Sequence, residues 1–275
     1  MIGPAKGALY DRSSLSWRLN SQALVLLGGP RAAILQVCDP GIAAGVVKYS
    51  RYRTDPLGRL EGTLEAMLGI AFGTPQRRSE VLDRLERVHT AVAGTLDDGT
   101  QYSALDRDRQ FWVLATLTDT VIEVDRRYLG RMRSADRAAY YEESKAMATA
   151  FGIPDDLVPD DYEAFRDYFA ERIATLEPTD DSREVAATLM RPRVPFVPGF
   201  AWLPFNLITI ELMPSRMRDA LGMRRLNTAE SATLRAAQVS MRNSVAHLPV
   251  GLLANPSTAE RFAAQPERGR LHSWH

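Results

Sequence analysis

Apolar residues recur at three- and four-residue spacing through most of the chain, which is the period of an amphipathic α-helix. Runs that alternate apolar and polar residues, the pattern of half-buried strands, are scarce. Turn and stop residues divide the pattern into predicted helices over residues 21–38, with a break at 28–30, and over 57–72, 76–93, 107–128, 134–151, 159–176, 206–221 and 229–246. We therefore predict an all-α fold, a multi-helix bundle.

The domain organisation follows from the length and from the position of the prolines. A chain of 275 residues with 45% hydrophobic residues can form one large domain or two small ones. The only linker-like region is 178–204, where prolines are too frequent for a regular element. The sequence shows no internal repeat. We predict a single all-α domain over residues 1–262 and a flexible tail rich in arginine and glycine over 263–275.

Charge and cysteine content limit which partners and which cellular compartment we expect. The 34 basic and 34 acidic residues balance, so no overall field attracts phosphate backbones, and nucleic acid is not expected as a partner. The single cysteine, Cys38, cannot form an internal disulfide, and the first residues do not have the pattern of a signal peptide. We expect a cytoplasmic location.

The longest apolar stretch is residues 196–213, FVPGFAWLPFNLITIELM. Two prolines interrupt it and a glutamate lies near its end, so it is a poor transmembrane span. Its four aromatic residues, Phe196, Phe200, Trp202 and Phe205, need apolar cover. We expect the stretch beside the entrance of a pocket or in peripheral contact with a membrane surface, and ordinary core packing is the alternative.

His89 is the histidine with the clearest structural setting. It follows Leu82 by seven residues and Leu85 by four, so it shares the apolar phase of the predicted helix 76–93 and points inward. A lone buried histidine is either a core residue with a satisfied ring or a metal ligand. The sequence pattern leaves both interpretations open.

Arg59 and Thr63 form a second candidate pair, because residues four apart share one helix face. Met67 and Ile70 continue that helix face and are apolar. A guanidinium beside them needs a partner. A nearby surface carboxylate is the simplest such partner. We predict that His89 lies buried in the middle of its helix and faces the helix that carries this pair. No Ser-His-Asp, Walker or dinucleotide-binding motif occurs, so those enzyme classes are not supported.

Four blocks along the chain resemble one known family. LLGGPRAAILQVCDPGIAAGV, RYRTDPLGRLEGT, RVHTAVAG and YSALDRDRQFWVLATLTDT are similar to blocks of the helical oxygenases that include latex-clearing rubber oxygenases and the mycophenolate-pathway oxygenase. A fainter similarity continues through LMPSRMRDALG to about Phe262. The resemblance implies an oxygenase with haem b in a buried pocket between central helices, acting with dioxygen on an apolar organic substrate.

The resemblance also implies roles for particular residues. The family histidine of the third block is the proximal haem ligand, and this position is His89. An arginine and a threonine of the second block lie on the distal side, and they match Arg59 and Thr63, which we take as catalytic and haem-contacting residues. Thr116, in the fourth block, is a further candidate for the haem pocket, with core packing as the alternative. His247, in another predicted helix, is the rival iron ligand.

Two positions depart from the family pattern. Rubber oxygenases have a lysine immediately before the distal threonine, where it can occupy the sixth iron position, but this chain has Gly62. A lysine-closed iron is therefore not expected. Many relatives have histidine before the proline of the first block, whereas this chain has Asp39 before Pro40. We expect Asp39 to cap the helix that begins at Pro40.

Two other functions fit the same sequence. A helical protein that binds a lipid or a partner without redox turnover is supported by residues 196–213 and by Asp39. A haem protein that senses or carries a ligand is the other. A Soret absorption band would exclude the first, and steady consumption of dioxygen with substrate would exclude the second.

Overall fold

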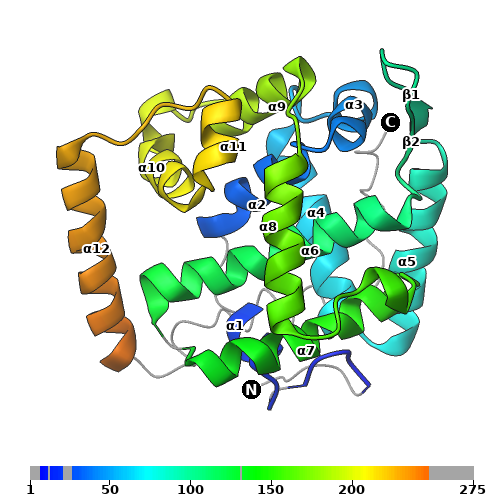
Figure 1. Cartoon of the computed structure of the whole chain (residues 1–275), viewed down its shortest axis with the longest axis horizontal. Coiled ribbons are helices and arrows are strands. Elements are labelled where there is room, and N and C mark those ends of the chain that lie inside the picture. Colours follow the sequence, from blue (N-terminus) through cyan, green and yellow to red (C-terminus); the bar gives the residue numbers. More distant parts are fainter. Residues whose placement is uncertain (1–6, 12, 21–26, 131, 248–275) are drawn as a thin grey trace.

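The computed structural model describes residues 7–11, 13–20, 27–130 and 132–247. These residues form twelve α-helices and one small two-stranded sheet, which confirms the prediction of an all-α fold (Figure 1). The α-helices are α1 (Leu15–Asn20), α2 (Gly29–Gln36), α3 (Pro40–Tyr49), α4 (Pro56–Phe72), α5 (Pro75–Thr90), α6 (Arg107–Val124), α7 (Ser134–Ala150), α8 (Tyr162–Thr175), α9 (Asp180–Met190), α10 (Leu203–Leu212), α11 (Ser215–Ala220) and α12 (Thr228–His247). The strands are β1 (Ala93–Thr95) and β2 (Gln101–Ser103), and shorter helical turns are η2 (Asp125–Leu129), η3 (Asp155–Leu157) and η4 (Gly199–Trp202).

Helix α6 lies at the centre, between the α5 side of the molecule and the α12 side (Figure 1). Its Trp112 is fully buried, and the indole Nε1 donates a hydrogen bond to the carbonyl of Leu35 in α2 at 3.2 Å. On α8, the ring of Phe169 packs 5.3 Å from the Trp112 ring. A large aromatic side chain removes much apolar surface from water, so this residue joins three helices in one core.

Asp39 caps α3, as predicted. Its Oδ1 accepts hydrogen bonds from the backbone N–H groups of Gly41, at 2.9 Å, and Ile42, at 3.1 Å. Pro40 occupies the first helical turn, where a missing N–H costs nothing. The local signal of an aspartate before a proline was therefore sufficient to place the start of this helix.

The predicted linker over residues 178–204 was wrong in its first half, because α9 occupies 180–190. Thr179 and Ser182 form a reciprocal capping box that starts this helix. Pro178 lies before the helix and the other prolines of the region follow its end, so none interrupts it. The single helix predicted over 206–221 was also wrong. It is two helices, α10 and α11, separated at Pro214. Of the predicted helix 21–38, residues 21–26 lie outside the described residues.

The helix predicted over 76–93 is shorter, because α5 ends at Thr90 and the chain then enters the β1–β2 hairpin. Gly99 makes the turn with φ +87°, and the Tyr49 hydroxyl donates to the backbone of β1 at 2.9 Å. Hairpin pairing and this bond to α3 take up the backbone groups that a longer helix would have used. His89 therefore lies in the last turn of α5, which corrects its predicted position in the middle of the helix.

The apolar stretch 196–213 is divided between solvent and core. Ile210 and Leu212 are buried, whereas Phe196 and Phe200 are 105% and 79% exposed. The expectation of ordinary core packing therefore holds for the C-terminal part alone. No helix among the described residues is long and apolar enough to cross a membrane. The predicted tail, 263–275, lies outside the described residues.

Candidate functional site

Helices α4 and α5 form an antiparallel pair that carries the candidate site. Ala66 and Ile70 of α4 pack against Val81 of α5, and Leu85 of α5 joins the same apolar cluster. The spacing of these residues by four is the helix repeat that the sequence predicted. Beyond Leu85, His89 lies near the C-terminal end of α5.

His89 is half-buried beside Arg59 of α4. Burial and the positive charge of the Arg59 guanidinium lower the pKa of the His89 imidazole, so the neutral ring is favoured. Within the part of the chain that the structure describes, the imidazole makes no hydrogen bond. A neutral imidazole whose nitrogens are not engaged by protein groups has the chemistry of a metal ligand. The predicted orientation toward the Arg59 helix is supported by this proximity.

The Arg59 side chain is held by two hydroxyl groups. Its Nε donates to the Ser50 hydroxyl, directly after α3, at 3.2 Å, and its Nη1 donates to Thr63 Oγ1. The Thr63 hydroxyl in turn donates to the Arg59 carbonyl at 2.9 Å. Burial lowers the pKa of Arg59 to about 10, which leaves the guanidinium charged at neutral pH. The structure thus joins Arg59 to Thr63 on α4, and it places Arg59 close enough to His89 for its charge to act on the imidazole.

Thr116 makes its hydrogen bonds elsewhere. It is fully buried in α6, where its hydroxyl donates to the Val113 carbonyl at 2.7 Å and accepts from Gln36 Nε2 of α2 at 3.1 Å. These contacts give Thr116 a packing role between α2 and α6. A contact of Thr116 with a haem pocket stays a prediction.

The His89 imidazole is compatible with a haem group. Among the described residues, no group of three or more histidine, cysteine, aspartate or glutamate side chains is placed to hold a metal. A porphyrin supplies four nitrogen ligands itself, so one neutral imidazole from the protein is enough to hold haem iron. His89 meets that requirement.

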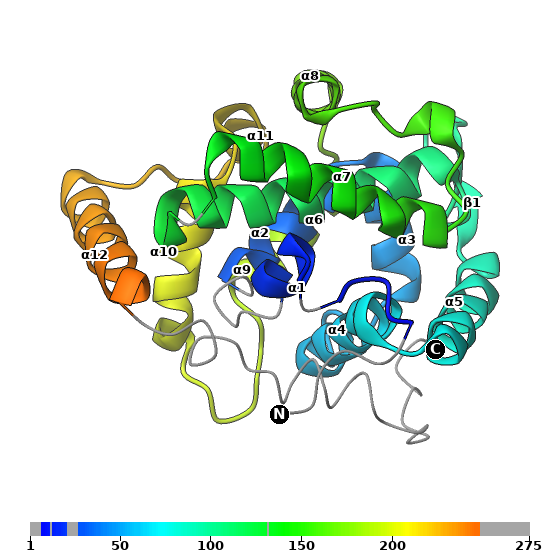
Figure 2. The ribbon, with the colours of Figure 1, turned by 90° about the horizontal axis from the view of Figure 1, so that it is seen from below.

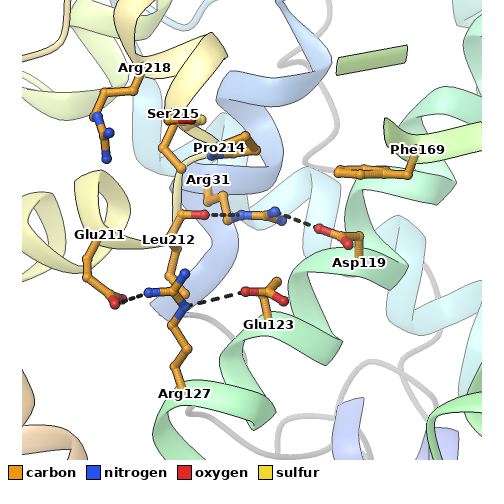
Figure 3. A pocket seen from close by; sticks show the side chains of 11 residues that line it. Arg31, Asp119, Glu123, Arg127, Phe169, Glu211, Leu212, Pro214, Ser215 and Arg218 are labelled. Atoms are coloured by element: carbon orange, nitrogen blue, oxygen red, sulfur yellow. Dashed lines mark hydrogen bonds and ion pairs between the residues drawn. The ribbon is translucent and has the colours of Figure 1, made fainter. Parts of the chain in front are cut away.

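A separate cavity of about 430 Å³ lies between α2, α6 and the α10–α11 segment, and it is lined mainly by charged side chains (Figure 3). Arg31 is 2% exposed and is the most deeply buried of them. It donates to Asp119 at 2.6 Å, to Thr120 at 2.5 Å and to the Leu212 carbonyl at 2.9 Å. Burial raises the pKa of Asp119, and the neighbouring Arg31 opposes that rise.

Three other charged residues of this cavity are also paired with one another. Arg127 contacts Glu123 of α6 at 3.4 Å and also Glu211 of α10 (Figure 3). No local pattern in the sequence indicates this network, because Arg31 and Asp119 are 88 residues apart. Neither His89 nor Arg59 lines the cavity. The hydrogen bonds of Arg31 join α2 to α6 and α10, and the Arg127–Glu211 pair joins η2 to α10.

The described residues form a helical fold in which the half-buried His89 lies beside Arg59 at the α4–α5 pair. A family model described as the catalytic domain of the ER-bound oxygenase mpaB/B′ and rubber oxygenase matches residues 17–243. The chain therefore belongs to this oxygenase family, which confirms the resemblance found in the sequence.

Two curated relatives come from Mycobacterium bovis and Mycobacterium tuberculosis, and both are named as uncharacterised proteins. Each is 25% identical to this chain over 148 residues, which is 52% of the chain and 58% of the relative. The similarity thus spans little more than half the length of these relatives. No solved structure matches the chain.

Proposed function

We propose that the protein is a haem-b-dependent oxygenase that uses dioxygen to oxidise an apolar organic substrate, with His89 as the proximal iron ligand. The observation that carries this proposal is the half-buried His89 ring, kept neutral by burial and by Arg59 and without a hydrogen bond among the described residues. Membership in an oxygenase family supports the same reaction class.

Each residue of the site has a distinct task in this proposal. When bound, haem b supplies the redox chemistry with dioxygen. His89 holds the iron through a ring nitrogen. Arg59 places a fixed positive charge at the site, which favours a bound anionic or polarised oxygen group. Thr63 and Ser50 hold the guanidinium in position, so less side-chain entropy is lost when a ligand binds.

Gly62, at the position of the rubber-oxygenase lysine, leaves no amine at that point of α4 to compete for the iron. A bound haem would therefore remain accessible to a small ligand at this point of α4. The balanced charge of the chain supports small apolar molecules and dioxygen as partners rather than nucleic acid, and the lone buried Cys38 is compatible with a cytoplasmic location.

An absorption spectrum of the haem-reconstituted protein tests the proposal. We expect a Soret band in the wild-type protein that is lost or strongly weakened in His89→Ala and partly restored by added imidazole. The matched control is His247→Ala, which should keep the Soret band near its original position. Normal haem content and an unchanged spectrum in folded His89→Ala would overturn the ligand assignment.

A second measurement separates an oxygenase from a haem sensor or carrier. Steady dioxygen consumption that depends on an added apolar alkene or isoprenoid supports turnover. Stable haem binding with no consumption across such substrates would favour a sensor or carrier. Absence of any Soret band after reconstitution would favour the helical binding protein without redox activity.

A further inference from the structure

Exposed large hydrophobic side chains are concentrated in one short segment. Five of the eight that the described residues contain belong to residues 196–205, and they are Phe196, Val197, Phe200, Leu203 and Phe205. Two more, Leu57 and Leu60, lie in the first turns of α4. A contiguous group of exposed apolar side chains marks a surface that contacts a partner.

The backbone of this segment presents its side chains outward. Phe196 has φ +64°, and it is the one non-glycine residue among those described with a positive φ. A bulky residue rarely adopts this conformation, because its Cβ crowds the backbone. The Phe196 ring is completely exposed and so makes no compensating contact within the protein. A strained backbone that displays an aromatic ring to solvent is typical of a binding segment.

Along the chain, the charges within the segment are basic. No acidic residue occurs between Glu184 and Glu211, whereas Arg191 and Arg193 directly precede the apolar group and are both exposed. Arginine beside exposed aromatic and aliphatic side chains matches the boundary between the acyl chains and the headgroups of an anionic lipid layer.

The exposed Leu57 and Leu60 belong to α4, which lies on the same side of the molecule as the chain that leads into this segment. Figure 2 shows α4 and the loop that follows α9 on the same side of the molecule. Arg59 lies on α4 between Leu57 and Leu60 in the sequence. A surface that rests on these residues therefore includes the helix that contributes Arg59 to the candidate site.

We propose that residues 191–205, together with Leu57 and Leu60, form a peripheral membrane-binding surface for a bilayer with anionic headgroups. Phe196, Val197 and Phe200 enter the interface, and Arg191 and Arg193 pair with lipid phosphates. This surface is independent of haem binding, so its test does not depend on the proposed enzymatic function.

Co-sedimentation of the full chain with vesicles tests this surface. The vesicles contain phosphatidylcholine and phosphatidylglycerol in about equal amounts, with pure phosphatidylcholine as the comparison. We expect Phe196→Ser/Phe200→Ser to reduce the partition coefficient about tenfold, because two rings no longer enter the interface. Val239→Ser is the matched control, since Val239 is exposed on α12, outside the segment, and should leave binding unchanged.

A charge variant provides an independent measurement. Arg191→Glu/Arg193→Glu should lose binding to the anionic vesicles while its binding to pure phosphatidylcholine changes little. Phe196, Phe200 and both arginines are exposed, so these substitutions remove little packing, and circular dichroism should show unchanged helix content. Loss of affinity in both variants supports the proposal.

Three results would overturn it. One is wild-type protein that stays in the supernatant with anionic vesicles, and another is binding that is equal in the wild type and in Phe196→Ser/Phe200→Ser. The third is a self-association, seen by sedimentation velocity without lipid, that the phenylalanine variant abolishes while vesicle binding is unaffected. That result would assign the surface to a second copy of the chain.

Discussion

Arg109 Nε donates a hydrogen bond to Asp39 Oδ1 across 3.0 Å and joins the first turn of α6 to the start of α3. The same carboxylate caps α3 through two backbone N–H groups, and its Oδ2 accepts from Arg172 of α8 at 3.4 Å. Asp39 is 6% exposed, so these partners replace water around a buried charge. The family histidine at this position could not supply the same negative charge, which explains in physical terms what the aspartate does here.

Asp39→Ala should destabilise the fold by about 3 kcal/mol, because it removes the helix cap and leaves two partly buried arginines without their shared carboxylate. Asp39→Asn is the matched control. It keeps the cap and the shape while losing the charge, so its cost should be smaller. Urea denaturation followed by circular dichroism measures both, and equal stabilities of Asp39→Ala and wild type would contradict the assigned role.

Two adjacent glycines should respond differently to the same substitution. A Cβ on Gly28 would collide with the Thr120 and Val124 side chains, whereas a Cβ on Gly29 would meet nothing within 4 Å. Thr and Val are stiff at χ1 and cannot move aside easily. Gly28→Ala should therefore lower the unfolding free energy by about 1–3 kcal/mol, and Gly29→Ala should be neutral or slightly stabilising. Thermal melts that rank the two variants in the opposite order would refute this packing.

The Cys38 thiol should be almost inert in the native protein. It is completely buried, and burial raises its pKa to about 12. At pH 8 we expect alkylation by iodoacetamide to be slower than in unfolded protein by on the order of a thousandfold, since the thiolate is the reactive form. Mass spectrometry with and without guanidinium measures this ratio.

The same raised pKa has a consequence for stability. Because the native state holds this proton more tightly than the unfolded state, the stability contributed by the Cys38 thiol falls as the pH rises from about 8.5 toward 12. Cys38→Ala should remove this part of the alkaline destabilisation. An identical alkaline loss of stability in wild type and Cys38→Ala would contradict the assignment to this thiol.

Arg59→Ala should affect ligand reactivity more than haem retention. The proposed haem is held by His89, whereas Arg59 contributes a charge-assisted hydrogen bond of about 1.5–3 kcal/mol to a distal ligand. We expect the Soret band to persist while dioxygen consumption falls by roughly tenfold or more. Thr63→Val tests whether Thr63 acts by positioning, since it removes the hydroxyl that holds the guanidinium but keeps the charge. Loss of haem in Arg59→Ala, in folded protein, would place Arg59 in haem binding instead.

Part of the candidate site was accessible from the sequence. The spacing of four between Arg59 and Thr63 predicted their shared face, and the apolar phase of His89 with Leu85 predicted its orientation. That His89 lies near Arg59 depends on the packing of α4 against α5, which no local pattern encodes. Thr116 shows the limit of the approach, because its motif suggested a pocket and its hydrogen bonds go to α2 and its own helix.

The helices and several of their ends could be predicted from the sequence, because caps and prolines act on neighbouring backbone groups. Asp39 before Pro40 is enough to begin α3. The packing of the helices determines which of two adjacent glycines must lack a side chain. It also determines that Arg31 pairs with a carboxylate in another helix. The packing also leaves Phe196, Phe200 and Phe205 facing solvent. These outcomes depend on distances between segments remote in the chain, which are set by how the helices pack rather than by how each one forms.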